Sequence, residues 1–201
     1  MILNSTTPKT VSEAIKVFCA DIDSAQPPIY VPVRPDPTAA INSCFGSVSN
    51  FVSRGGGSIQ YGWIIWAGSK QLFLEAEFHA VWVSPFYEMI DITPKIDGEV
   101  NILFLPDMKR VYKGQLIENK RKLLVINDAT LRWLWLGHHR HLFKERHFKN
   151  GQVDMEAALR DKDQWDQWES QAEALTFSRN CYCPCGSGKR LKSCCGRRSP
   201  S

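Results

Sequence analysis

The chain has 201 residues, enough for one domain with a small appendage, because single domains commonly have about 100–200 residues. Apolar residues make up 43% and charged residues 23%, values that exclude a mainly disordered chain. The formal net charge of +4 is unevenly spread: residues 179–201 carry six Lys or Arg and no acid, whereas residues 153–177 carry seven acids and two cations. This pattern predicts an acidic or nucleic-acid partner for the tail, or attraction within the chain.

A helix and a proline-rich connection are predicted at the start of the chain. Thr10 and Glu13 fit a capping box, and apolar residues follow at helical spacing, so we expect a helix over about 10–23. Five prolines lie between Pro27 and Pro37 and predict an extended connection without a helix.

A second helix is predicted next, with a cysteine in its first turn. Asn42 or Ser43 provides the cap, and Cys44 begins a run of apolar residues at helical spacing. Three consecutive glycines, residues 55–57, end this helix. Cys44 therefore lies at a helix N-terminus, where the dipole and the free amides stabilise a thiolate.

The pattern then changes to strands rich in aromatic and branched residues. Two such runs, 61–67 and 71–83, are separated by Gly-Ser-Lys, which predicts a hairpin. Two more runs, 88–93 and 99–105, are divided by the turn signal Asp-Gly. We therefore expect a series of antiparallel strands.

The remaining elements are less uniform in type. Residues 123–127 predict a further strand, whereas residues 131–136 fit either a strand or the start of a helix. A polar, acidic helix is expected over about 153–176, where the acids are concentrated.

These elements predict an α+β fold, with an antiparallel sheet, helices on one side and a small C-terminal zinc-binding module. We expect three parts: an α+β body over 1–150, an acidic connecting helix over 151–178, and the module over 179–201.

The sequence also gives an expectation about location. The N-terminus lacks a basic segment followed by an apolar run, and no window reaches the roughly 18 apolar residues that span a bilayer. We therefore expect a cytoplasmic protein with no membrane partner, in which thiols stay reduced. In that compartment a cysteine cluster indicates a metal site more readily than disulfides.

Five of the seven cysteines lie within the sixteen residues CYCPCGSGKRLKSCCG, 181–196. Zinc in a structural site takes four soft ligands in a tetrahedron, and closely spaced cysteines supply two at once. The predicted ligands are two pairs, Cys183 with Cys185 and Cys194 with Cys195. A disulfide-linked tail and free thiols in a disordered end are the alternatives.

The stretch CPCGSGKRLKSCCG resembles the SEC-C motif, the zinc-binding module found at the C-terminus of the SecA translocation ATPase, over about residues 181–198. In that family a Cys-x-Cys pair and a terminal Cys-Cys or Cys-His pair bind the metal, and they map onto the four predicted ligands. The resemblance implies a closed, structural zinc site with no open position for a reacting water. Leu191 departs from the family, where an aromatic residue is commoner, and Cys181 is left as a spare thiol.

A candidate catalytic site is predicted in the body. A hairpin that turns near Pro85 would pair residues whose numbers add up to 170, so that His79 faces Asp91 and both point to one side. If the helix that begins at Cys44 packs against that side, His79 can take the proton of the thiol. The opposite face would then hold an apolar set suited to the core: Ala80, Trp82, Ile90 and Ile92.

This order of Cys at a helix start, His on a strand and Asp on the next strand is similar to the transglutaminase-like and papain-like cysteine enzymes. The phrases FHAVW and MIDITP, within residues 41–94, carry the resemblance. It implies a hydrolase or acyltransferase acting on a peptide or amide bond, with Cys44 as nucleophile, His79 as general base and acid, and Asp91 orienting His79. The alternative is structural, with a small buried thiol, a half-exposed strand histidine and a polar residue before a turn.

A non-catalytic function is the alternative for the whole chain. Four of the five histidines lie in the basic segment 137–149, which we interpret as a solvated basic face and not as a metal site. With the zinc module, this face predicts an adaptor that binds a protein partner, and nucleic acid or the ribosome is the other partner class. Trp133 and Trp135 would then stack on bases, or else belong to the core.

Overall fold

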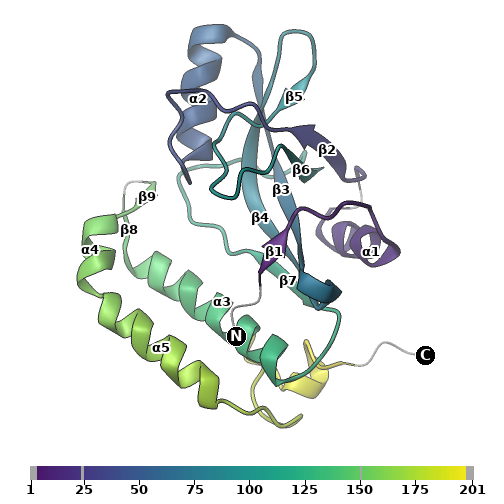
Figure 1. Ribbon diagram of the computed structural model, residues 1–201, viewed down its shortest axis with the longest axis vertical. Coiled ribbons are helices and arrows are strands. Elements are labelled where there is room, and N and C mark those ends of the chain that lie inside the picture. Colours follow the sequence, from purple (N-terminus) through teal and green to yellow (C-terminus); the bar gives the residue numbers. More distant parts are fainter. Residues whose placement is uncertain (1–3, 24, 150, 198–201) are drawn as a thin grey trace. The chain divides into compact units, whose positions relative to one another are not determined.

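The computed structural model describes residues 4–23, 25–149 and 151–197. The chain forms two compact units, coloured along the sequence in Figure 1. They are a sheet unit, Asn4–Ser69 with Leu74–Tyr112, and a helical unit, Lys70–Phe73 with the residues from Lys113 onward. Antiparallel strands and helices confirm the predicted α+β class. The predicted domain boundaries after residues 150 and 178 stay a prediction.

The sheet unit is built on antiparallel strands in the order β2-β6-β3-β4-β5, with β1 beside β3 (Figure 1). The strand bounds are β1 Ser5–Thr6, β2 Ile29–Pro32, β3 Ser58–Gly68, β4 Phe73–Val83, β5 Met89–Ile90 and β6 Asn101–Pro106. β3 and β4 form the predicted long hairpin around a short 3-10 turn, Ser69–Gln71.

The sheet curls on itself, because β2 at one end of the strand order also meets the chain that follows β5. The Asp91 N–H donates to the carbonyl of Pro32 (3.0 Å), and the Arg34 N–H donates to the carbonyl of Asp91 (2.9 Å). Val33 and Asp91 thereby form a parallel bridge. The backbone of Asp91 is thus fixed by a strand far from it in the sequence.

Helix α1, Glu13–Ile22, starts two residues later than the predicted cap suggested. Its N-cap is Ser12, whose side chain accepts the N–H of Ile15 at 3.4 Å. The predicted cap at Thr10 was therefore wrong by two residues.

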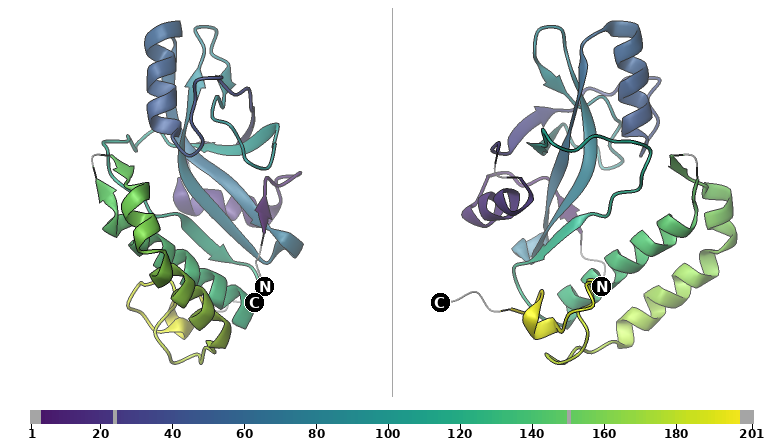
Figure 2. Two further views of the ribbon diagram at one scale, coloured as in Figure 1. Left: turned by 60° about the vertical axis from the view of Figure 1, so that its left-hand side comes forward. Right: turned by 180° about the vertical axis from the view of Figure 1, so that it is seen from behind.

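Helix α2, Cys44–Gly55, begins after the N-cap Ser43, one of the two predicted caps. It lies beside β3 (Figures 1 and 2). Its Val48 is buried in a cluster with the side chains of Ala80, Ile90 and Ile92. A second buried cluster joins side chains of β2, β3, β4 and β6: Val31, Ile64, Val81, Ile102 and Phe104.

The helical unit is built mainly from the helices α3 and α5. Its elements are β7 Lys120–Leu123, α3 Asp128–Arg146, β8 Phe148–Lys149, β9 Gln152–Val153, α4 Met155–Arg160 and α5 Lys162–Ala174. α3 and α5 lie side by side in both views of Figure 2. β7 pairs with β4, whose first residue Phe73 belongs to this unit.

The helix and strand boundaries of this unit differ from the predicted ones. α3 starts with a capping box between Asn127 and Thr130, so residues 131–136 are helical and the strand alternative was wrong. The strand expected over 123–127 lies earlier, as β7. The predicted acidic helix is interrupted at Asp161, which ends α4 and caps α5.

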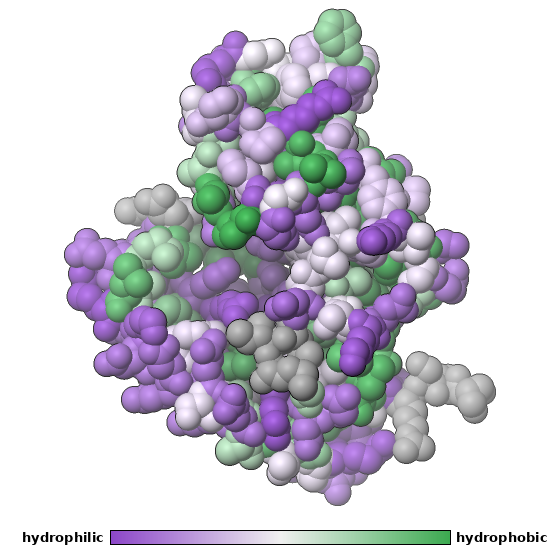
Figure 3. Space-filling model, viewed as in Figure 1, coloured by the Kyte–Doolittle hydropathy of each residue, from purple (hydrophilic) through white to green (hydrophobic). Residues whose placement is uncertain are grey.

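The acidic segment has a hydrophilic surface. Hydrophilic side chains gather over its helices, α4 and α5, in Figure 3. Among the described residues, no helix combines the length and the apolar character needed to cross a membrane.

Candidate metal centre and candidate catalytic site

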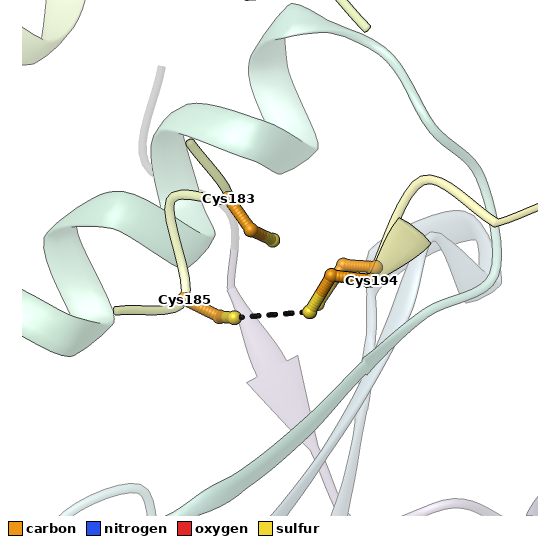
Figure 4. Close-up of side chains that lie close together, drawn as sticks. Cys183, Cys185 and Cys194 are labelled. Atoms are coloured by element: carbon orange, nitrogen blue, oxygen red, sulfur yellow. Dashed lines mark hydrogen bonds between the residues drawn. The ribbon is translucent and has the colours of Figure 1, made fainter. Parts of the chain in front are cut away.

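Four cysteine sulfurs converge near the end of the helical unit (Figure 4). The Sγ atoms of Cys183, Cys185, Cys194 and Cys195 all lie within 4.8 Å of one another. The sulfurs of Cys185 and Cys194 are 3.5 Å apart, and those of Cys194 and Cys195 are 3.9 Å apart. A tetrahedral site with metal–sulfur bonds of about 2.3 Å has sulfur–sulfur distances of about 3.8 Å. The four predicted ligands therefore fit one metal ion.

Main-chain hydrogen bonds bring the two cysteine pairs together. The N–H of Cys183 donates to the carbonyl of Lys189 (2.7 Å), and the N–H of Leu191 donates to the carbonyl of Cys181 (2.9 Å). Gly186 turns the chain between the pairs with a φ of +77°, a conformation that glycine adopts without strain. These local contacts thus bring the two pairs close together.

The cysteine segment packs against α3. Leu131 of α3 forms a buried cluster with Cys183 and Leu191, and Leu191 is only 2% exposed. The ring of His138, also on α3, lies so close to Gly186 that an added Cβ would come within 2.1 Å of it. A tail with so few apolar residues therefore depends on this contact, and a bound metal ion would add to its stability.

The thiols of Cys183, Cys185 and Cys195 compete for protons through hydrogen bonds. The hydrogen bond with Cys185 raises the pKa of Cys183 to about 11, and the same bond lowers the pKa of Cys185. Hydrogen bonds with both residues raise the pKa of Cys195. A bound cation removes the competition, because it stabilises all four thiolates. Cys181 packs beside the cluster but is not one of the four converging residues.

The three residues predicted for catalysis meet inside the sheet unit. Nε2 of His79 lies 3.0 Å from Oδ2 of Asp91, where a ring N–H can donate to the carboxylate. Cys44 lies near enough to the same imidazole to raise its pKa. Cys44, His79 and Asp91 are 8%, 5% and 0% exposed.

β4 and β5 do not pair in the predicted register. Trp82 pairs with Ile90, so paired residue numbers add up to 172 and not to 170. A shift of two keeps every side chain on its predicted face, because strand side chains alternate between faces. His79 and Asp91 are consequently diagonal neighbours and not direct partners, and they still reach one another.

α2 packs differently from the prediction. Its Val48 contacts Ala80 and Ile90, which belong to the face that was expected to lie opposite His79. β5 pairs with β4 only at Trp82 and Val83. The part of β4 that carries His79 is therefore not paired with β5, and the first turn of α2 can approach it there. Cys44 meets His79 because it is the first residue of that helix.

Asp91 is held ionised by its neighbours. Nζ of Lys95 lies 2.6 Å from Oδ2, and the N–H of Thr93 donates to Oδ1 at 2.9 Å. Burial alone would raise the pKa of Asp91, but attraction by His79 and then by Lys95 holds it well below the usual range. The sequence reasoning missed Lys95, because residues 91–95 form no helix and a spacing of four residues predicts a contact only on a helix.

The charge state of His79 follows from the same contacts. Burial lowers the pKa of His79, but the proximity of Cys44 and of Asp91 outweighs it and raises that pKa from 6.5 to about 9. The site therefore favours an imidazolium at neutral pH. A positive ring beside a sulfur stabilises the thiolate, the form of cysteine that acts as a nucleophile.

Aromatic rings pack around Phe45, the residue after Cys44, and the sequence reasoning did not identify them. Phe45 stacks on Tyr112, with ring centroids 3.8 Å apart and planes 7° from parallel. Phe45 also packs against Tyr61 and Phe78, at centroid distances of 6.3 Å and 5.7 Å. No short-range pattern connects Tyr112 to Phe45, because the two are far apart in the sequence.

The histidine-rich segment lies mainly on α3. Trp133 stacks on Phe73 at 3.7 Å, and Trp135 stacks on His139 at 3.6 Å, so both tryptophans have ring partners within the helical unit. A cavity of about 350 Å³ lies between α3 and the tail. It is lined by residues that include Trp135, His138, His139, Phe177 and Tyr182.

Comparisons with known proteins bear on the tail alone. No family model and no solved structure matches the chain. The chain is similar to the protein translocase subunit SecA of Sulfurimonas denitrificans, with 53% identity over 34 residues. The match covers 17% of this chain and 4% of that protein, and nothing in it supports the resemblance of residues 41–94 to transglutaminase-like enzymes. The similarity and the four converging thiols together fit a SEC-C-like metal-binding module at the C-terminus.

Proposed function

We propose that the sheet unit is a cysteine hydrolase or acyltransferase that acts on a peptide or amide bond. One observation carries the proposal: the buried imidazole of His79 lies 3.0 Å from the carboxylate of Asp91, and the buried Cys44 is near enough to raise the pKa of the same ring. A nucleophile near a base, with a group that orients the base, is the arrangement that nucleophilic catalysis requires.

The residues divide the reaction as follows. Sγ of Cys44 attacks the substrate carbonyl while His79 holds the thiol proton, and the backbone N–H of Cys44, which has no acceptor within its helix, stabilises the oxyanion. His79 then protonates the departing amine, and a thioester remains on Cys44. Water, or an acceptor amine, attacks the thioester with His79 as base, which releases the acyl group and restores the thiol.

Chemical labelling tests this proposal. Iodoacetamide is added at pH about 6.5, and the labelling rate of each cysteine is read by peptide mass spectrometry. We expect Cys44 to label faster than Cys19, a buried thiol whose pKa burial raises to about 12. His79→Ala should slow Cys44 labelling at least about tenfold, because the thiolate loses its cation. His141→Ala, on α3, is the matched control and should change nothing.

Two results would contradict the catalytic role. Labelling of Cys44 at an equal rate in the wild type and in His79→Ala would mean that the imidazole does not activate the thiol. Labelling of Cys44 no faster than Cys19 would mean that Cys44 is a structural thiol.

We further propose that the metal in the C-terminal module is zinc, in a structural role. Four thiolate ligands close the coordination shell and suit Zn²⁺, and the SEC-C motif that the tail resembles is a zinc-binding module. Zinc would fold the tail against Leu131 of α3 and would not take part in the reaction.

A second candidate is a non-catalytic adaptor in the reducing cytoplasm, with a protein or ribonucleoprotein partner. The supporting observation is the charge of the tail: its exposed cations include Arg179, Lys189, Arg190, Lys192 and Arg197, and no acid lies among residues 174–197. Partner binding that persists in Cys44→Ala and disappears on charge reversal at Lys189 and Arg190 would favour this function over catalysis.

A further inference from the structure

The cavity between α3 and the cysteine segment, residues 181–196, has walls made largely of rings. It has a volume of about 350 Å³, and its lining residues all belong to the helical unit. They include the ring side chains of Trp135, His138, His139, Phe177 and Tyr182. The part of the lining that the structure describes contains no Asp, Glu, Lys or Arg. Pockets for small ligands commonly have about 300–1,000 Å³, so this cavity has room for one planar ring system.

The rings on α3 are held by contacts within the helical unit. Trp135 stacks on His139, with ring centroids 3.6 Å apart, and Nδ1 of His139 donates to the carbonyl of Trp135 at 2.9 Å. Trp168 of α5 packs edge-on against the same imidazole at a centroid distance of 5.2 Å. Tyr182 differs from these rings, because it comes from the cysteine segment and is 66% exposed. The cavity therefore combines a fixed wall on α3 with an exposed ring beside it.

Positive charge lies beside the cavity and not among the residues that line it. The guanidinium of Arg190 lies 4.5 Å from the ring centroid of Tyr182. The carbonyl of Lys189 accepts the N–H of Cys183, another lining residue, at 2.7 Å. Both cations are exposed to solvent. A negative ligand group just outside the cavity would therefore meet positive charge.

Glu118 also contacts the lining, and its charge is partly balanced. Its Oε1 lies 3.3 Å from Nδ1 of His138 and 3.4 Å from Nη1 of Arg121. The pairing with Arg121 reduces the repulsion that this carboxylate would exert on a negative ligand.

We propose that the cavity binds one base of a single-stranded nucleic acid, whose neighbouring phosphates contact the exposed cations of the cysteine segment. The arrangement favours a ligand with an uncharged planar group and a negative backbone, because the rings line the cavity and the cations lie outside it. Stacking on aromatic side chains binds bases of any sequence, and Lys and Arg bind the phosphates. This inference rests on the second candidate function, of which it names the partner, and it does not depend on Cys44.

Base stacking is tested with the full chain and a fluorescent oligouridylate of about 12 nucleotides, by fluorescence anisotropy. We expect Tyr182→Ala to weaken binding at least about fivefold and Tyr182→Phe, which keeps the ring, to weaken it less than about twofold. Tyr87→Ala is the matched control, because Tyr87 is 89% exposed and belongs to the sheet unit. An equal affinity of Tyr182→Ala and the wild type would overturn the stacking. The DNA oligomer of the same length shows which kind of single strand binds more tightly.

Contact with the phosphates is tested by the salt dependence of the same binding. Lys189→Gln should reduce the slope of log affinity against log salt by about one. Lys162→Gln, on the acidic helix α5, is the matched control and should leave the slope unchanged. An unchanged slope in Lys189→Gln would overturn the assignment of this cation.

Competition separates binding of a base from attraction of charge alone. Inorganic polyphosphate and polyglutamate, at the same concentration of negative charge, should compete at least about tenfold less well than unlabelled oligouridylate, because neither carries a base. Equal competition by polyphosphate would overturn the role of the cavity. Equal competition by polyglutamate would overturn the nucleic acid and favour an acidic protein partner.

Photochemical cross-linking places the base without any substitution in the protein. Irradiated 5-iodouridine within the oligomer couples to a neighbouring aromatic side chain, and peptide mass spectrometry identifies the residue. Cross-links should fall on Trp135, His139, Phe177 or Tyr182. No cross-link, or cross-links in the sheet unit alone, would overturn the cavity as the site.

Failure of this inference can be told apart from failure of the proposed reaction. Tyr182→Ala should leave the iodoacetamide labelling rate of Cys44 unchanged, because the two residues belong to different units. If the wild type binds no oligomer but His79→Ala slows Cys44 labelling, the reaction stands and the base site is wrong. If the oligomer binds through Tyr182 and His79→Ala changes nothing, the base site stands and the reaction is wrong.

Discussion

Replacing Asp91 with Asn should lower the pKa of His79 by more than one unit. In the wild type the pKa of His79 is raised from 6.5 to about 9, with Cys44 and then Asp91 opposing the effect of burial. Each pKa unit corresponds to about 1.36 kcal/mol, so the site stabilises the imidazolium by on the order of 3 kcal/mol. Asp91→Asn keeps the shape of the side chain and removes its charge. In that variant only Cys44 still raises the pKa of His79 against the lowering effect of burial.

The sign of the effect on stability follows from this shift. A group whose pKa is raised on folding contributes stability that is fully present below its unfolded pKa, and that stability is lost as the pH rises through its folded pKa. The free energy of unfolding should therefore fall by up to about 3 kcal/mol between pH about 6.5 and pH about 9 through His79. The loss should be much smaller in Asp91→Asn and absent in His79→Gln.

The assay is NMR titration of the imidazole signals, with His79 assigned through its loss in His79→Gln. The difference in unfolding free energy between the wild type and His79→Gln, measured with urea at pH 6 and pH 9.5, provides the second readout. A wild-type pKa for His79 at or below 6.5, or an equal pKa in Asp91→Asn, would refute the account of this site.

Three further predictions concern the tail. Metal analysis of the purified chain should find about one zinc per chain, and Ser at both Cys183 and Cys194 should abolish it; zinc retained by that variant would show that the ligand set is wrong. Leu191→Ala should destabilise the tail by about 2–4 kcal/mol, seen as earlier cleavage in limited proteolysis, because it empties a buried site. Gly186→Ala should weaken zinc affinity at least tenfold in a chelator competition, whereas Gly188→Ala, with a similar φ of +70° but open space around it, should have a smaller effect; equal effects would mean that the contact with α3 is unimportant.

The convergence of the four cysteines could be predicted from the sequence because their geometry is local. Two cysteine pairs separated by a short glycine-containing turn converge with few constraints from the rest of the chain. The contact of Leu191 and Cys183 with Leu131 could not be foreseen, because it joins segments that are distant in sequence.

In the sheet unit, an error in the predicted strand register did not affect the predicted contact between His79 and Asp91. The predicted hairpin register was wrong by two residues, but strand alternation preserved the face on which His79 and Asp91 lie. The packing of α2 could not be deduced, since the sequence does not say which face of a sheet a helix covers. Tyr112 escaped notice for a similar reason: a stacking contact leaves no mark on the spacing of either partner.

The bridge between Val33 and Asp91 has a consequence for the proposed reaction. Cys44 and His79 follow β2 in the chain, so a fragment that starts after Pro35 would still carry every side chain of the proposed reaction. Such a fragment would nevertheless be inert, because the carboxylate would have lost the strand that fixes its backbone. We therefore expect the thiol to become reactive only once the chain after β5 has paired with the chain after β2, so reactivity of Cys44 would report that this bridge has formed.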